Sequence, residues 1–139
     1  MRKLLENLSL CFAAGVAGGF ANSLVVWWCG VAGVTAAADV KLAPDLTSAW
    51  LYPRLVWGGL WGFLFLLPLG NTSYVLRGLL FSLVPTIFSL FYFLPAQGKG
   101  ILGIELGAQM PMFVVLFNAV WGAVAALWLK FAGSGVAKG

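Results

Sequence analysis

Arg54 is the residue whose type and place in the chain most favour a chemical role. It lies near the start of a long apolar stretch, YPRLVWGGLWGFLFLLPL, which covers residues 52–69. A cation inside a membrane-crossing segment can line a solute path or hold a partner. Two structural alternatives remain open: the side chain could reach the lipid headgroups, or it could pair with an acid. The candidate acids are Asp39, Asp45 and Glu105.

Asn22, Ser82, Ser89 and Asn118 are uncharged polar residues that also fall inside apolar stretches. A buried asparagine in lipid needs a partner, and a hydrogen bond between two helices there contributes roughly 0.6–2 kcal/mol. Together with Arg54, these residues either join helices or form a polar lining for a solute path. Glu105 lies in a glycine-rich segment, where it is either an ion site in a re-entrant loop or a solvated acid.

The sequence contains little that supports enzyme chemistry. There is no histidine, which removes histidine-ligated metal sites and Ser-His-Asp catalysis. Cys11 and Cys29 are 18 positions apart on one expected helix, or about 27 Å, so they cannot form a disulfide within one chain. No phosphate-binding loop or cluster of metal ligands is present. We therefore expect neither a catalytic site nor a metal nor a cofactor.

The composition predicts a membrane protein. Hydrophobic residues make up 62% of the 139 positions and charged residues 9%, and the mean hydropathy is +0.99. A soluble domain carries about 25% charged residues, so the expected partner of this surface is the lipid bilayer. The net charge of +4 comes from basic residues scattered along the chain. That pattern does not predict binding to nucleic acid.

We expect one all-α integral membrane domain over residues 1–139, with four transmembrane helices at about 4–31, 52–69, 74–94 and 111–131. The first apolar stretch is too long for a signal peptide, whose apolar region has roughly 7–15 residues. Pro85 should kink the third helix. The two connecting segments, 35–49 and 95–110, are polar or glycine-rich. We expect them to be irregular and to lie at the interface, or, for the second, to be re-entrant.

Small residues recur on one face of the expected helices. The pairs Gly15/Gly19 and Gly58/Gly62 each have the GxxxG spacing, and Gly122 lies one turn after Asn118. In lipid, small residues allow two helix backbones to approach closely. We therefore predict that these glycines are helix-packing positions.

The distribution of charge predicts the orientation. The basic residues on one side are Arg2, Lys3, Arg77, Lys130 and Lys138, and those on the other are Lys41, Arg54 and Lys99. The positive-inside rule then places both termini in the cytoplasm and both irregular segments outside. Leu60-Trp61-Gly62 matches Val120-Trp121-Gly122 at an offset of 60, which either reflects a two-fold internal repeat or has arisen by chance.

The motifs YPRLVWGGLWG, RGLLFSLVPT and FNAVWGAVAALWLK resemble those of small bacterial inner-membrane proteins with four helices and no assigned activity. The resemblance implies a bacterial cytoplasmic membrane and carries no site residues. Small multidrug exporters have a glutamate embedded in their first helix, whereas the only acid of the first crossing here is Glu6, at its start. The glycine–arginine pattern in the first helix of dual-topology fluoride channels is also absent.

The sequence thus favours a non-enzymatic membrane protein that packs through its glycine faces, either into a homo-oligomer or as an accessory subunit of a membrane complex. The alternative is a small channel or transporter for an ion or small solute. Its path would be lined by Asn22, Arg54, Ser82, Ser89 and Asn118.

Overall fold

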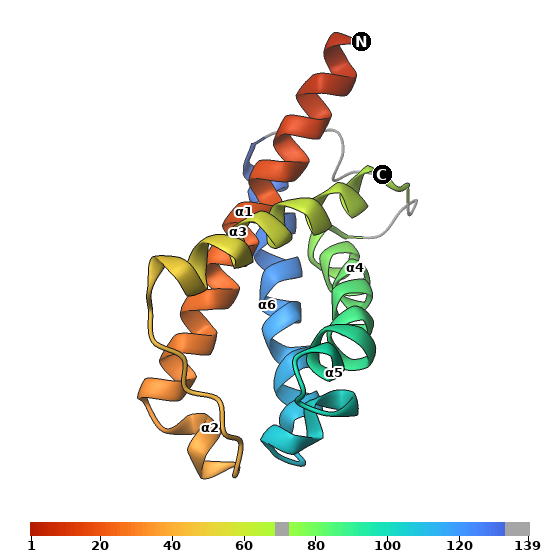
Figure 1. Cartoon of the computed structure of the whole chain (residues 1–139). Coiled ribbons are helices and arrows are strands. Elements are labelled where there is room, and N and C mark those ends of the chain that lie inside the picture. The colour runs from red at the N-terminus through yellow and green to blue at the C-terminus, as the bar shows by residue number, and fades with distance from the viewer. Residues whose placement is uncertain (69–72, 133–139) are drawn as a thin grey trace.

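A computed structural model describes residues 1–68 and 73–132 of the chain (Figure 1). Every regular element in these ranges is helical. The elements are α1 (Arg2–Val31), α2 (Val34–Ala37), α3 (Ser48–Gly62), the 3₁₀ turn η1 (Phe63–Leu66), α4 (Tyr74–Phe88), the π-helical turn η2 (Ser89–Phe93), α5 (Leu94–Ala96), the 3₁₀ segment η3 (Ile101–Leu106) and α6 (Met110–Phe131).

Within the described ranges, three helices are long and apolar enough to cross a membrane: Arg2–Val31, Tyr74–Ala96 and Met110–Phe131. The second of them joins α4, η2 and α5 into one continuous rod. These ranges agree closely with three of the four expected crossings. The chain is therefore an all-helical protein with the features of a membrane protein.

The expectation of a fourth span at residues 52–69 is wrong. The Thr47 hydroxyl accepts a hydrogen bond from the Trp50 N–H at 3.2 Å and caps a helix that begins at Ser48. That α-helix ends at Gly62 after 15 residues, where the chain tightens into the 3₁₀ turn η1, and the segment is not among the long apolar helices of the described ranges. It also crosses the other helices obliquely (Figure 1). Residue 69 lies outside the described ranges.

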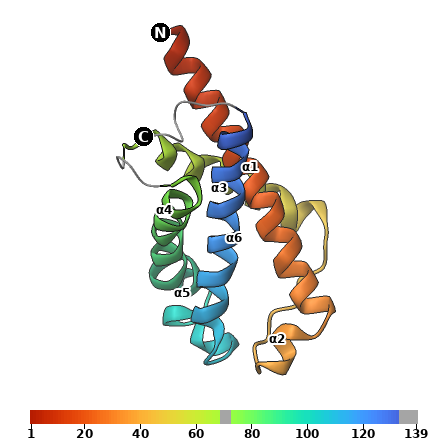
Figure 2. The same cartoon turned by 180° about the vertical axis from the view of Figure 1, so that it is seen from behind.

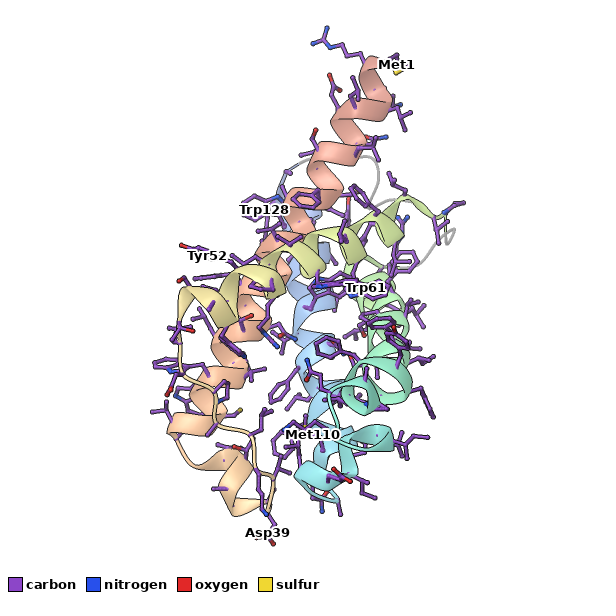
Figure 3. The ribbon with its side chains drawn as sticks, viewed as in Figure 1. Met1, Asp39, Tyr52, Trp61, Met110 and Trp128 are labelled. Atoms are coloured by element: carbon purple, nitrogen blue, oxygen red, sulfur yellow. The ribbon has the colours of Figure 1, made fainter. Side chains whose placement is uncertain are left out.

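Helix α6 lies between α1 and α4 and packs against both, as both views show (Figures 1 and 2). Helix α3 packs across α1. The start of α1 and the end of α6 lie at one end of the bundle, whereas α2, α5 and η3 lie at the other. Figure 3 marks these ends with Met1 and Asp39. Lys138, which was assigned to the first end, is outside the described ranges.

The crossing of α1 and α3 is built from glycine. A Cβ atom added at Gly58 would lie 2.7 Å from the Gly15 carbonyl oxygen and 3.0 Å from the Gly19 Cα. A Cβ at Gly62 would be 3.0 Å from the Gly15 Cα. The four predicted packing glycines of these two helices thus face one another within one chain.

Glycine also sets the contacts of α6. Gly122 faces Gly78 of α4 so closely that a Cβ on either residue would collide with the carbonyl of the other. On the other side of α6, the Trp121 indole donates to the carbonyl oxygens of Gly15 and Gly58, at 3.2 Å each. One side chain of α6 therefore joins both helices of the α1–α3 crossing.

The two expected irregular segments meet at the end of the bundle marked by Asp39. The Lys41 N–H donates to the Leu106 carbonyl oxygen at 2.7 Å. Gly107, with φ of 153°, lies directly against the backbone of residues 39 and 40. Both segments contain short helical turns, and residues 40–47 between α2 and α3 are not helical.

Pro85 does not end the rod formed by α4, η2 and α5, but the helix widens into the π turn η2 four residues later. The hydroxyls of Ser82 and Thr86 bond back to the carbonyls of Leu79 and Ser82, at 2.6 and 2.7 Å. The proposed repeat gains no support, because Gly62 ends a short oblique helix while Gly122 lies in the middle of a 22-residue one.

Because the atoms that oppose Gly58 belong to a backbone, they cannot move aside for a larger residue. We predict that Gly58→Ala lowers the free energy of unfolding by about 1–3 kcal/mol, as is typical for overpacking. Thermal unfolding of the purified protein in a non-ionic detergent measures the effect.

Val56→Leu is the matched control, because it also adds one carbon to α3, at a residue that is 53% exposed. We expect its midpoint to stay at the wild-type value. Equal midpoints for Gly58→Ala and Val56→Leu would show that the α1–α3 backbones are not in contact.

Candidate functional site

Arg54 leaves α3 toward α1 rather than toward the headgroups. Its Nε donates to Ser23 Oγ at 2.9 Å, and its Nη2 donates to Asn22 Oδ1. The Ser23 hydroxyl itself donates a hydrogen bond to the Gly19 carbonyl oxygen at 2.7 Å. Two of the three guanidinium nitrogens of Arg54 are therefore fixed by neutral groups on α1.

Asn22 extends this network to α6. Its amide Nδ2 donates to the Phe117 carbonyl oxygen while its Oδ1 accepts from Arg54. The residue is 8% exposed, so both ends of the amide are satisfied by protein. Asn22 thus joins three helices, which is the structural alternative anticipated for it.

Arg54 lies 4.6 Å above the ring centroid of Trp50, one turn earlier on α3. The alternative in which Arg54 pairs with Asp39, Asp45 or Glu105 is wrong: within residues 1–68 and 73–132 the only ion pair is Arg2–Glu6. No hydrogen bond to Nη1 of Arg54 is found in those ranges either. The guanidinium therefore keeps its charge uncompensated and one nitrogen available.

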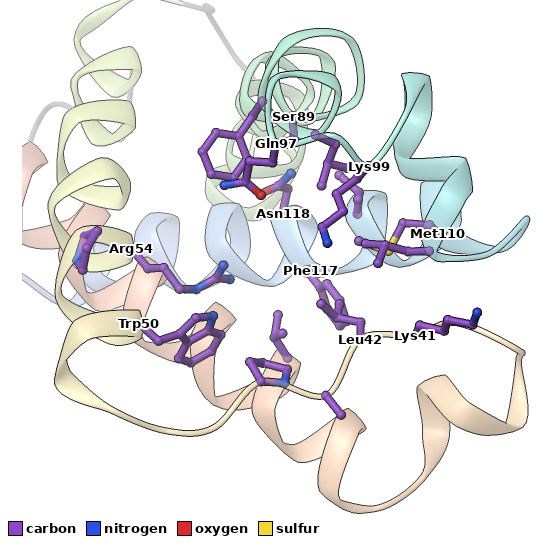
Figure 4. A pocket seen from close by; sticks show the side chains of 18 of the residues that line it. Lys41, Leu42, Trp50, Arg54, Ser89, Gln97, Lys99, Met110, Phe117 and Asn118 are labelled. Atoms are coloured by element: carbon purple, nitrogen blue, oxygen red, sulfur yellow. The ribbon is translucent and has the colours of Figure 1, made fainter.

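A cleft of about 540 Å³ opens beside Arg54, between the α3 side of the molecule and the η2–α5–α6 side (Figure 4). Its polar lining residues are Lys41, Arg54, Ser89, Gln97, Lys99 and Asn118. Lys99 and Arg54 extend into the hollow from opposite sides, while the amine of Lys41 points away from it (Figure 4). Among residues 1–68 and 73–132, no acidic residue lines the cleft.

A second, smaller hollow of about 220 Å³ continues from the first. The two share the lining residues Pro53, Arg54, Ser89, Phe93 and Asn118. The second hollow is otherwise mostly aromatic, with Trp57, Trp61, Phe88 and Trp121 in its wall. It too has no acidic lining residue. The junction of the hollows is therefore polar and their far end is apolar.

The structure brings together Arg54, Ser89 and Asn118, which line both hollows, and Asn22, which lines the second. Asn118 is half-buried, and its amide has no hydrogen-bond partner among the described residues. Two predicted residues lie elsewhere. Ser82 lines neither hollow and is bonded to its own helix. Glu105 is exposed on η3 and also lines neither.

Sequence reasoning missed Ser23, Trp50, Gln97 and Lys99 as parts of the site. Two of them carried a readable signal. Ser23 follows Asn22 in an otherwise apolar helix, and Trp50 precedes Arg54 by four residues, the spacing of neighbours on one helix face. Gln97 and Lys99 reach the cleft only because the chain turns back after α5, which no local pattern indicates.

Comparisons with protein-family models, with curated proteins and with solved structures found no match for this chain. The function is therefore argued from the cleft itself.

The two asparagines of the site should differ in their contribution to the free energy of unfolding. We predict that Asn22→Ala lowers the free energy of unfolding by about 1–2 kcal/mol, because it removes the hydrogen bonds that Asn22 forms with Arg54 and with the Phe117 carbonyl. Asn118→Ala is the matched control and should leave the free energy of unfolding unchanged, since its amide bonds to no described residue. Thermal unfolding in non-ionic detergent compares the two variants. An equal loss of stability in both would contradict these assignments.

Proposed function

We propose that this chain is a small non-enzymatic membrane protein that binds an anionic ligand in the cleft beside Arg54. The observation that carries the proposal is the charge of the cleft. The cationic groups of Arg54 and Lys99 extend into it beside two amides and a hydroxyl, and no carboxylate of the described residues lines it. Arginine and lysine are the usual ligands of phosphate and carboxylate groups, to which they form charge-assisted hydrogen bonds.

The state of Arg54 supports this proposal. A cation within a membrane protein that has no counter-ion is costly and is usually functional. Here neutral groups on α1 orient the guanidinium, and nothing in the described ranges neutralises it. An anion that entered between Arg54 and Lys99 would supply the missing charge, and the free Asn118 amide could donate to it.

This choice favours the transporter alternative over association through glycine faces. Gly15, Gly19, Gly58, Gly62 and Gly122 are all occupied by contacts inside the chain, so they offer no face to a second copy. The cleft, by contrast, presents Arg54 and Lys99 without a carboxylate from the described residues. We propose that it either holds its ligand as a binding protein or passes it on as a carrier.

We further propose that the protein resides in a bacterial cytoplasmic membrane with both termini in the cytoplasm. The start of α1 and the end of α6 lie at the same end of the bundle, where Arg2, Lys3 and Lys130 are also located. Basic residues accumulate on the cytoplasmic side of membrane proteins. The cleft entrance at Lys41 and Lys99 would then face the outside.

Binding of an anion at Arg54 should change the fluorescence of Trp50, because the guanidinium lies over that ring. We predict a saturable change when the protein, in phosphatidylcholine nanodiscs, is titrated with butyl phosphate. Butylammonium should cause none. Subtracting the response of a Trp50→Phe variant isolates this tryptophan from the other six.

Lys99→Gln should weaken butyl phosphate binding about fivefold, since an exposed charge pair contributes up to about 1 kcal/mol. Lys3→Gln removes the same charge near the start of α1, at the other end of the bundle from Lys99. It should leave the affinity for butyl phosphate unchanged. If butyl phosphate gives no saturable signal, or if Lys99→Gln binds it like Lys3→Gln, the anion site is refuted.

A further inference from the structure

The two hollows meet at Arg54 and Asn118 and differ in chemistry. The first carries the cations, whereas the second is walled by indole and phenyl rings. A small inorganic anion would use only the first. From this pairing, and resting on the anion site proposed above, we propose that the ligand is an anionic membrane lipid, with its phosphate between Arg54 and Lys99 and an acyl chain in the aromatic hollow.

The aromatic hollow is bordered by contacts between the aromatic rings of α3 and those of α4. Trp57 stacks on Phe88 with centroids 5.9 Å apart, and Trp61 meets the same ring edge-on at 5.4 Å. No backbone hydrogen bond joins α3 to α4 in the described ranges. Contacts between such rings can separate and reform more easily than the backbone contacts of the α1–α3 crossing, so this side of the hollow can admit a hydrocarbon chain.

The aromatic hollow also reaches the outer surface of the protein. Trp57 in its wall is 47% exposed, and Phe93, which lines both hollows, is 40% exposed. Side chains of this kind on a membrane helix face the lipid. A lipid could therefore enter sideways from the bilayer, with its headgroup moving toward Arg54 and Asn118 and its chain remaining in apolar surroundings throughout.

Charge complementarity selects the headgroup. A zwitterionic phosphatidylcholine carries a quaternary ammonium that the cleft cannot neutralise, because no carboxylate lines either hollow. Phosphatidic acid presents a bare phosphate that can accept from Nη1 of Arg54, from the Lys99 ammonium and from the Asn118 amide. The cleft should therefore prefer it to phosphatidylcholine with the same acyl chains.

Lipids with brominated acyl chains test the proposal, because bromine quenches the tryptophans that it touches. The full-length protein is placed in phosphatidylcholine nanodiscs that contain a fixed fraction of brominated phosphatidic acid or of brominated phosphatidylcholine. We expect brominated phosphatidic acid to quench more strongly. The excess should be reduced in Lys99→Gln, kept in Lys3→Gln, and reduced in the double variant Trp57→Phe with Trp61→Phe, which removes two of the three tryptophans that line the aromatic hollow.

The outcomes separate this inference from the anion site. If the excess falls in Lys99→Gln but is undiminished in the double tryptophan variant, the anion site stands and the acyl chain does not contact Trp57 or Trp61, which overturns the inference. If Lys99→Gln behaves like Lys3→Gln, the anion site itself fails. If the two brominated lipids quench equally while butyl phosphate still binds, the ligand is a small soluble anion. Circular dichroism and the thermal midpoint verify that each variant is folded.

Discussion

The contact between the backbones of α1 and α3 is the constraint on which the site depends. Gly15 and Gly19 face Gly62 and Gly58 in antiparallel order, because the two helices run in opposite directions. Four residues after Gly19 on α1 comes Ser23, and four residues before Gly58 on α3 comes Arg54. These two side chains form a hydrogen bond of 2.9 Å. Arg54 thus lies one helical turn beyond the glycines at which the backbones of α1 and α3 are in contact. Its guanidinium reaches α1 because the glycines have brought the two backbones together.

This placement gives Arg54 two roles that do not compete. Its Nε and Nη2 are used by Ser23 and Asn22, and through Asn22 the network reaches the Phe117 carbonyl of α6. These bonds hold the side chain in one orientation but add no negative charge. The residue is therefore both an anchor between helices and a preorganised cation at the cleft. A side chain already fixed by the protein loses little entropy when a ligand binds.

The three long helices could be predicted from apolar length alone, and the structure has them at nearly the expected boundaries. The second crossing could not be predicted correctly, because its apolar run continues through Gly62 into a 3₁₀ turn while the helix begins earlier, at the Thr47 cap. The glycine spacing correctly indicated close packing, yet it did not say whether the partner helix belongs to the same chain. The partners of Arg54 were missed because hydrogen bonds to neutral groups leave no charge pattern in the sequence. The acids that were considered as possible partners of Arg54 do not pair with it.

The most direct measurement of the charge inside the cleft uses a cysteine at Ser89, which lines both hollows, in a background where Cys11 and Cys29 are replaced by alanine. Its rates of modification by an anionic and a cationic methanethiosulfonate of similar size are compared after correction for their reactivity with a free thiol. An anion site predicts faster modification by the anionic reagent, and a loss of that preference when Lys99→Gln is added. Equal rates, or faster modification by the cationic reagent, would contradict an anion-binding cleft beside Arg54.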